Sequence, residues 1–311
     1  MSGVNIEVLV IGRSCLDTMA VVKRFPRENE KAPLEHRLME GGGQGGTAAC
    51  CIGRLGGRVA YVGKLGDDPE GLFCLKRLQD FGVNTDRVEI VPDGKTPVAY
   101  LFVTRDTGDR TIIYEPNRLP KIALDSGLER IMEQSEVILL DPETTYLSKA
   151  LRDRENRYYK IVYDCETRRE GLEKMMALAD YFIPSMDFLK EEPAGSRNLS
   201  VQQKLIRLKG LIGGELVVTD GPNGAYYFSH DRLIQVKPPQ IGVVDTTGAG
   251  DNFHGAFALA IAKGLGMTGA VRLAVAVASL SCRDYGGRQG LPDWQEATAT
   301  AELLETTPFL F

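Results

Sequence analysis

Short apolar runs alternate with helix-forming segments along most of this chain, and this alternation limits the fold more than any other sequence feature. The chain opens with an apolar, β-branched run at residues 6–12 that ends in glycine. From residue 128 onward, runs such as 137–140, 160–164 and 215–219 are separated by helical patterns. Strands that alternate with helices pair in parallel, because each helix carries the chain back across the sheet. The sequence therefore predicts an α/β fold with a doubly wound, mostly parallel sheet and helices on both faces.

Two segments leave this pattern. Residues 15–40 hold a polar, proline-bearing stretch between two alternating runs, and residues 96–118 contain a second extended pair. Alternation of apolar and polar residues is typical of strands with one exposed face. We therefore expect residues 15–40 and 96–118 to form a small β lid. Residues 1–14, 41–95 and 119–311 then form one α/β core.

Composition and charge argue against two classes of function. The chain has 37 Lys and Arg against 42 Asp and Glu, and no basic block that would serve a nucleic-acid binder. Its longest apolar stretches, such as 256–262, are far shorter than the roughly 20 residues of a membrane-spanning helix. The first residues show no signal-peptide pattern, and the six cysteines lack C-x-x-C spacing. We expect a cytoplasmic protein with no nucleic-acid or membrane partner.

The segment 245–258 carries the strongest chemical signal. Gly248 and Gly250 stand immediately before an Ala-rich, apolar helix. Glycine allows positive φ and close approach of a ligand to the backbone, and the amides at a helix N-terminus bind anions. Asp251 falls in the first turn, where a carboxylate can accept a proton from a substrate hydroxyl while the amides hold a phosphate. The alternative is that Asp251 only caps the helix.

A second glycine-rich segment lies at residues 41–51. Its spacing fits G-x-G-x-x-G, but about 30 residues with a proline hairpin separate it from the first strand. The match to a dinucleotide-binding site is therefore weak. A dehydrogenase, which would need such a site, ranks behind the other interpretations of this chain given below. A backbone surface that receives a small polyol fits better, with Gln44 and Thr47 supplying hydrogen bonds. A helix entry without a ligand is the remaining alternative.

These two segments together resemble the ribokinase-type (PfkB) carbohydrate kinase family. The resemblance extends through residues 54–71, through TDGPNGA at 219–225 and through GGRQGLP at 286–292, so it covers nearly the whole chain. The segment 245–258 is highly specific, and the N-terminal one is moderately so. The stretches near residues 25–37 and 109–113 resemble the ketohexokinase and sulfofructose kinase branches most. The resemblance implies a ribokinase-like fold and an ATP-dependent sugar kinase.

The resemblance also implies a role for each matching residue. Asp251 would be the general base, and the amides of Gly248, Ala249 and Gly250 would form the anion hole. The residues expected to bind the sugar are Asp17, Gly43, Gln44, Thr47 and Glu143. Those expected to line the nucleotide site are Ser185, Thr219, Gly221, Gly224, Val275 and Ser279. Asp245, Thr247 and Gly286 resemble the monovalent-cation loop of some relatives, which adds K⁺ to the expected cofactors ATP and Mg²⁺.

The chain departs from the family pattern at sites that concern the metal and the sugar. Thr47 stands where relatives usually carry asparagine, and His254 replaces another asparagine. Residues 185–188 read Ser-Met-Asp-Phe where relatives often have Asn-x-x-Glu, a motif tied to magnesium and phosphate. Ser185, Asp187 or Asp164 could substitute for that motif. We expect His254 to be a structural helix residue.

The substrate predicted from these residues is a small, neutral sugar or polyol, phosphorylated at a primary hydroxyl. The charge of Glu143 would repel a sulfonate, which argues against an anionic sugar. A nucleoside kinase is the alternative, because Tyr100, Phe102 and Tyr114 in the lid could stack on a base. A non-catalytic sugar- or nucleotide-binding protein on the same scaffold is a further alternative. In many relatives the lid is the dimer contact, so we expect a homodimer.

Overall fold

A ten-stranded sheet runs through the centre of the molecule in the computed structural model, which describes residues 6–107, 110–191, 199–230 and 232–308. Its strands are β1 (Ile6–Ile11), β4 (Val59–Gly66), β5 (Asn84–Val91), β8 (Ser135–Leu140), β9 (Lys160–Cys165), β10 (Tyr181–Pro184), β11 (Glu215–Thr219), β12 (Ala225–Ser229), β13 (Arg232–Val236) and β14 (Thr306–Pro308). Their order is β14-β13-β12-β11-β10-β9-β8-β1-β4-β5. Neighbours from β11 to β5 along this order are parallel, and those from β11 to β14 are antiparallel.

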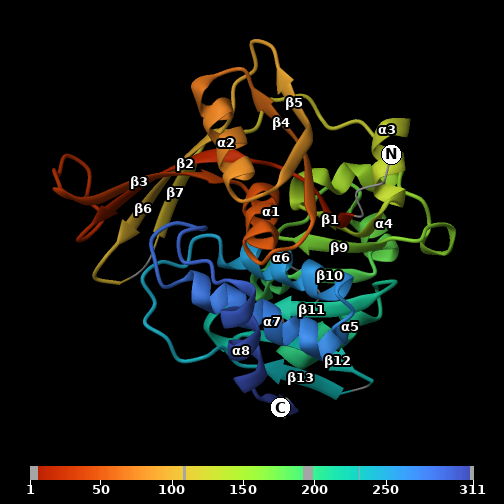
Figure 1. Cartoon of the computed structure of the whole chain (residues 1–311). Helices are drawn as coiled ribbons and strands as arrows, with labels where there is room; N and C mark the ends of the chain where they lie inside the picture. The colour runs from red at the N-terminus through yellow and green to blue at the C-terminus, as the bar shows by residue number, and fades with distance from the viewer. Residues whose placement is uncertain (1–5, 108–109, 192–198, 231, 309–311) are drawn as a thin grey trace.

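Helices cover both faces of this sheet (Figure 1). One face carries α1 (Gln44–Arg54), α2 (Pro69–Asp80), α6 (Ala249–Ala262), α7 (Gly266–Ser281) and α8 (Trp294–Leu303). The other carries α3 (Ser126–Glu133), α4 (Leu172–Leu178), α5 (Val201–Lys209) and the 3-10 turns η1 (Pro142–Lys149) and η3 (Met186–Glu191). Strand β1 shows the alternation: Val8 and Val10 pack in the first layer, and Leu9 and Ile11 in the second. The architecture is the predicted α/β class, with apolar strands buried on both sides.

Small residues let α6 pack very closely on α1. A Cβ atom built on Gly255 would lie 2.6 Å from the carbonyl oxygen of Ala48, so only glycine fits this crossing. The alanines Ala256, Ala258 and Ala260 of α6 are fully buried in the same layer. Because α1 and α6 touch along their length, their N-termini are held at the same edge of the molecule.

A second, four-stranded sheet projects from one side of the molecule (Figure 1). It consists of β2 (Cys15–Val22), β3 (Leu34–Gly42), β6 (Val98–Thr104) and β7 (Arg110–Tyr114), in the order β3-β2-β6-β7. These strands come from the two segments that left the βα pattern, except that β3 continues past residue 40. The connection before β7 includes residues 108–109, which lie outside the described part of the chain.

The two faces of this small sheet differ. Met19, Leu101 and Val103 are buried on one face and pack with Leu38 and with Tyr285 from the C-terminal part of the core. Because cross-strand neighbours share a face, the register puts Asp17 on this inner face and Tyr100 on the outer one. A hydrogen bond from Arg110 Nη1 to Thr246 Oγ1 (2.6 Å) also joins the sheet to the core.

No helix in the described ranges combines the length and the apolar character that a bilayer crossing requires. All six cysteines are buried side chains outside disulfides, as expected from their spacing.

Candidate active site

The candidate site lies where parallel strands β1, β8 and β9 end and where α1 and α6 begin. In doubly wound sheets, ligands bind at this edge, because the carboxyl ends of the strands and the helix N-termini face the same space. Arg13 follows β1, Asp141 follows β8, and Asp164 lies at the end of β9. The Gly43–Gln44 step opens α1, and Gly248 opens α6.

The N-terminus of α6 meets two other glycine-rich segments. Gly248 is the N-cap, with φ of 71°, a left-handed conformation that favours glycine. A Cβ atom on Gly248 would lie 2.7 Å from Gly287 Cα and 3.2 Å from Thr47 Cγ2. Three segments that are far apart in the sequence therefore converge at this helix end. A Cβ atom on Gly250 would meet no atom within 4 Å, so the first turn of α6 borders open space.

Asp251 lies in the first turn of α6, behind Gly248. Because the N-cap is Gly248, the interpretation of Asp251 as a simple cap is wrong. Burial and, next, the charge of Asp164 raise the pKa of Asp251 to about 8, while His254 opposes the shift. A carboxylate with a raised pKa beside a helix N-terminus can take a proton at neutral pH.

His254 is held by backbone contacts on both sides of its ring. Its Nδ1 lies 2.6 Å from the carbonyl oxygen of Gly250, and its Nε2 lies 3.2 Å from that of Ile183. Asp164 Oδ1 is 3.5 Å from the same Nε2. Burial lowers the pKa of His254. These contacts fit the predicted structural role, in which the ring links α6 to the ends of β9 and β10.

Asp17 and the glycine-rich loop are in direct contact. A Cβ atom on Gly42 would lie 2.1 Å from Asp17 Oδ2, so the carboxylate rests on the glycine backbone. Burial raises the pKa of Asp17 to about 6, against the opposing charges of Arg288 and Arg13. The Cys15 thiol donates to Asp17 Oδ1 (3.3 Å). The predicted sugar-binding carboxylate is thus fixed over the loop that opens α1.

The other residues predicted to bind the sugar lie in or next to this loop. Gly43 has φ of 80°, and a Cβ atom there would lie 2.6 Å from the carbonyl oxygen of Arg13. Gln44 Nε2 donates to Glu166 Oε2 (3.0 Å), and its Oε1 is buried without a partner among the described residues. Thr47 is buried, with its methyl group toward Gly248.

Glu143 lies in η1, just after β8, on the same edge of the sheet. Its Oε1 forms an ion pair with Arg169 Nη1 at 3.1 Å. Two residues earlier, the buried Asp141 accepts a hydrogen bond from the backbone N–H of Arg13 (2.5 Å). Burial raises the pKa of Asp141 to about 6.

The predicted nucleotide residues form a separate group on neighbouring elements. Ser185 follows β10 and pairs in parallel with Thr219 at the end of β11. The turn after β11 is η4 (Gly221–Asn223), and Gly221 and Gly224 have positive φ values of 46° and 84°. The remaining two residues, Val275 and Ser279, lie one turn apart on α7, where Ser279 Oγ donates to the Val275 carbonyl oxygen (2.7 Å).

The aspartates predicted to bind metal ions already have hydrogen-bond or ion-pair partners within the protein. Asp245 Oδ1 accepts from the N–H and the hydroxyl of Thr247 (3.0 and 2.8 Å), and Oδ2 accepts from the N–H of Gly286 (2.9 Å). Asp245 therefore ties the loop before α6 to the loop after α7. Asp187, a proposed magnesium residue, is largely exposed and pairs with Lys190 (2.5 Å). The described residues hold no group of three His, Cys, Asp or Glu side chains placed to bind a metal.

Sequence reasoning missed several polar residues at this edge. Buried side-chain atoms without a partner among the described residues include Arg13 Nε, Asp141 Oδ1 and two nitrogens of Arg288. Arg288 is only 1% exposed and donates through Nη2 to the Gly42 carbonyl oxygen (3.1 Å). Arg13 and Asp141 could have been found, because each follows a buried apolar run. Nothing in the sequence pattern predicts the contact of Arg288, which is 246 residues from Gly42.

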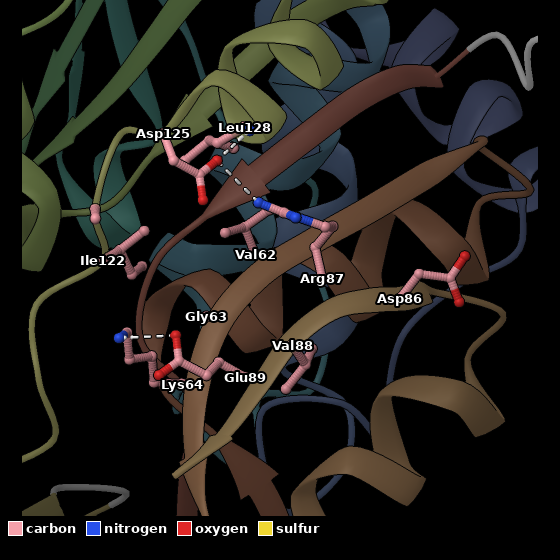
Figure 2. Close-up of a pocket in the computed structure, with 11 residues that line it drawn as sticks. Val62, Gly63, Lys64, Asp86, Arg87, Val88, Glu89, Ile122, Asp125 and Leu128 are labelled. Carbon is pink, nitrogen blue, oxygen red and sulfur yellow. Dashed lines mark hydrogen bonds and ion pairs between the residues drawn. The ribbon is translucent and has the colours of Figure 1, made fainter.

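A cavity of about 290 Å³ lies elsewhere, between β4, β5 and the segment before α3 (Figure 2). Its two cations are already paired, Lys64 with Glu89 (2.8 Å) and Arg87 with Asp125 (3.2 Å). It contains none of the predicted site residues. Arg13, Gln44 and Asp141, which have buried atoms without partners among the described residues, lie at the strand-end edge instead, and we take this edge as the candidate site.

Comparisons with known proteins agree with this geometry. The family model described as pfkB family carbohydrate kinase matches residues 5–294. A ribokinase of Lactococcus lactis is 31% identical over 304 residues, which are 96% of this chain and 98% of that protein. A deoxyribokinase of Salmonella typhi is 25% identical and covers 96% of this chain and 100% of its own length.

A solved structure of Arabidopsis thaliana ribokinase, complexed with ribose and ATP, has a TM-score of 0.79 and 25% identity. The match covers 96% of this chain and 99% of that one, and it confirms the ribokinase-like fold. The expected kinship with the ketohexokinase and sulfofructose kinase branches is not supported, because the chain is similar over nearly its whole length to ribokinases, at 31% and 28% identity for those of Lactococcus lactis and Bacillus subtilis. The chain belongs to the pfkB family of carbohydrate kinases and is an ATP-dependent sugar kinase.

Proposed function

We propose that this kinase transfers the γ-phosphate of ATP to a primary hydroxyl of a small sugar, with Asp251 as the general base. One observation carries the proposal: Gly248, at the start of the helix that bears Asp251, packs on Thr47 and Gly287. This contact puts the base beside the glycine-rich loop that supports Asp17. On this proposal, the residues predicted to bind the sugar and those predicted to transfer the phosphate would border one space.

The reaction follows from the groups around that space. Asp17, Gln44 and the loop at Gly43 would hold the sugar hydroxyls, and Thr47 and Glu143 would complete the pocket. Asp251 would take the proton of the attacking hydroxyl as its oxygen bonds to the γ-phosphorus and the bond to ADP breaks. The amides of Gly248, Ala249 and Gly250 would hold the transferring phosphoryl group, since helix N-termini stabilise anions.

The nucleotide would lie along the ends of β10 and β11. A Cβ atom on Gly221 would meet no atom within 4 Å, which leaves room for a ligand there, and Ser185 and Thr219 present hydroxyls at the same edge. Val275 and Ser279 would form the wall on α7. Because ATP is the donor, we place the activity in the cytoplasm.

We assign the magnesium site to Asp164 rather than to residues 185–188. Asp164 is buried, its pKa is raised well above the ordinary value by burial and by neighbouring carboxylates, and it raises the pKa of Asp251. Mg²⁺ usually takes one or two carboxylates, waters and substrate phosphates, so a cluster of three protein ligands is not needed. When bound, Mg²⁺ neutralises charge on the ATP phosphates.

We retain the loop of Asp245, Thr247 and Gly286 as a proposed K⁺ site. The Asp245 carboxylate already accepts three hydrogen bonds, and a carboxylate has about four lone-pair positions. A cation would therefore rely on backbone carbonyl oxygens of these loops more than on Asp245 itself.

The small sheet would act as a lid over the sugar and as the contact in a homodimer. Its inner face carries Asp17, and its outer face exposes Met39, Tyr100 and Ile113 in one row across the strands. The register weakens the nucleoside alternative, because Tyr100 and Phe102 lie on the outer face. Only Tyr114 shares the face of Asp17.

Release of ADP from MgATP across a panel of pentoses, hexoses, polyols and nucleosides tests the proposed function. We expect turnover with a small sugar and none with Asp251→Asn. Turnover with nucleosides alone would replace the sugar assignment. Tight ATP binding without any turnover would favour the non-catalytic alternative.

A further inference from the structure

Arg13 has its backbone fixed at the centre of the site. Its N–H donates to Asp141 Oδ2 (2.5 Å), and its carbonyl oxygen accepts from the N–H of Gly46 (3.0 Å). A Cβ atom on Gly43 would lie only 2.6 Å from that carbonyl oxygen. The residue is thus held between the end of β8 and the start of α1, which are the two walls of the proposed sugar pocket.

The guanidinium of Arg13 has no hydrogen-bond or ion-pair partner in the described part of the chain, and its Nε is buried. An arginine carries five N–H donors, so leaving them without acceptors in a partly buried place costs free energy. Asp141 does not satisfy them: its Oδ2 accepts from the backbone N–H of Arg13, and its Oδ1 is buried without a partner among the described residues. An acceptor from outside the chain, either water or a bound ligand, would satisfy them.

The charges around Arg13 show where that acceptor would be. Asp141, Glu143 and Asp251 all stabilise the charged guanidinium, and Arg13 in turn opposes the raised pKa of Asp17. The Arg13 guanidinium therefore lies near both the proposed sugar ligands and the proposed base. Other buried polar atoms border the same edge, including the free Oε1 of Gln44.

The ion pair of Glu143 changes the charge expected for the substrate. Glu143 already pairs with Arg169 at 3.1 Å. Arg169 compensates the negative charge of Glu143, so the charge of Glu143 no longer argues against an anionic substrate. Beside this ion pair, the Arg13 guanidinium makes no hydrogen bond or ion pair with the described residues.

We propose that Arg13 binds a carboxylate on the acceptor, so that the substrate is a small sugar acid rather than a neutral sugar. This inference rests on the proposed kinase function. A planar carboxylate matches the fork of a guanidinium with two parallel hydrogen bonds. A phosphate ester carries nearly two negative charges, which one arginine among Asp141, Glu143 and Asp251 balances poorly. The carboxylate is therefore the better match.

The test compares matched acids and neutral sugars: ribonate with ribose, gluconate with glucose, and 2-ketogluconate with fructose. We expect wild-type kcat/KM for at least one acid to exceed that of its neutral partner by about tenfold or more. In Arg13→Gln the acid should lose about 100-fold, mainly in KM, and at least tenfold more than the neutral sugar. Arg13→Lys should recover part of the loss. Arg152→Gln, which removes a surface guanidinium paired with Glu133, is the control for a lost positive charge.

Two outcomes overturn the inference. One is preference for neutral sugars in the wild type. The other is an equal loss of kcat for acids and sugars in Arg13→Gln, which would assign Arg13 to phosphoryl transfer. If no compound is phosphorylated, the proposed kinase function fails separately. Calorimetric binding of the acids without ATP then decides: binding that Arg13→Gln abolishes supports the carboxylate site, and no binding to the wild type removes it.

Discussion

Four aspartates of the candidate site share an environment that controls their protons. Burial raises the pKa of Asp17 and Asp141 to about 6 and that of Asp251 to about 8, and it raises the pKa of Asp164 well above its usual value. Each ionised carboxylate also disfavours ionisation of its neighbours. Bound cations and sugar hydroxyls would relieve this repulsion. The site is thus built to gain stability when its ligands bind.

Asp251→Asn tests the general base directly. The amide cannot accept the proton of the hydroxyl, so we expect kcat to fall by roughly 10²- to 10⁴-fold, the usual contribution of a general base. ATP affinity should stay near the wild-type value, because the amides of the first turn are backbone groups. Steady-state ADP release and calorimetry with ATP measure the two effects. Asp187→Asn, at an exposed carboxylate paired with Lys190, is the matched control.

The same substitution has an effect on stability that depends on pH. The pKa of Asp251 is raised in the folded protein, so the folded state binds an extra proton between about pH 4 and pH 8. Stability contributed by this proton is present at low pH and is lost as the pH rises through about 8. The amide side chain of the Asp251→Asn variant does not titrate, so this variant does not lose that stability as the pH rises. We therefore expect its melting temperature to exceed that of the wild type by an amount that grows from pH 5 to pH 8.5.

Each pKa unit corresponds to about 1.4 kcal/mol, and partial exposure of Asp251 reduces the effect to roughly 1–3 kcal/mol. Calorimetric melting of both proteins without ligand, across this pH range, measures it. A constant difference between the two proteins at all pH values would contradict the shift.

At the scale of single residues, the sequence predicted the chemistry of motifs but not their surroundings. Asp251 and its glycines are contiguous, so their pattern is visible in the sequence. The proposed role of Arg13 depends on its neighbours Asp141 and Glu143. In the sequence, 127 residues separate Arg13 from Asp141. The absence of a partner for its guanidinium is a property of the folded pocket.

Among the elements, the N-terminus of α6 has two glycines that are required for different reasons. Gly248 is needed for its φ of 71° and for its contact with Gly287. Gly250 has open space where a side chain would point. Conformation explains the first glycine, and the proposed phosphoryl group would explain the second.

Gly250→Val separates these roles. The new side chain would occupy the space proposed for the phosphoryl group, so we expect kcat/KM for MgATP to fall by about 100-fold or more, as for the loss of an anion-hole donor. The melting temperature should change by only a few degrees, since no atom lies within 4 Å of the new Cβ. Steady-state kinetics and thermal melting measure both.

Gly210→Val, at the C-cap of α5, is the control for a valine placed at a helix end, because the nearest atom to its Cβ is 3.5 Å away. Normal kinetics in Gly250→Val would remove the anion hole from this helix end.

The elements themselves were largely predictable. Buried β-branched runs such as 6–11 and 137–140 became adjacent parallel strands, because local pattern and tertiary burial agree there. The position of the small sheet was predictable from its proline-bearing and polar residues. Its register was not, since one residue of slip would exchange the faces of Asp17 and Tyr100.

The whole molecule presents its small sheet on one side, with an apolar row on the outer face. Met39, Thr18, Tyr100 and Ile113 are neighbours across the four strands. Met39, Tyr100 and Ile113 are 48%, 45% and 57% exposed. A row of exposed apolar side chains on a sheet that projects from the core favours association with a second copy.

Ile113→Glu tests the proposed homodimer. In a twofold contact the charge would meet its own copy across the interface, so desolvation and repulsion should raise the dimer dissociation constant by 100-fold or more, on the order of 3 kcal/mol. The monomer should keep its melting temperature, because Ile113 is largely exposed.

Leu303→Glu, at an apolar residue of α8 that is 82% exposed, is the control for a new surface charge. Sedimentation velocity of the three proteins over a range of concentrations reads the outcome. Equal sedimentation coefficients for wild type and Ile113→Glu would show that the outer face of the small sheet is not the contact. A monomer that keeps its sugar KM would also show that the sheet covers its own site without a partner.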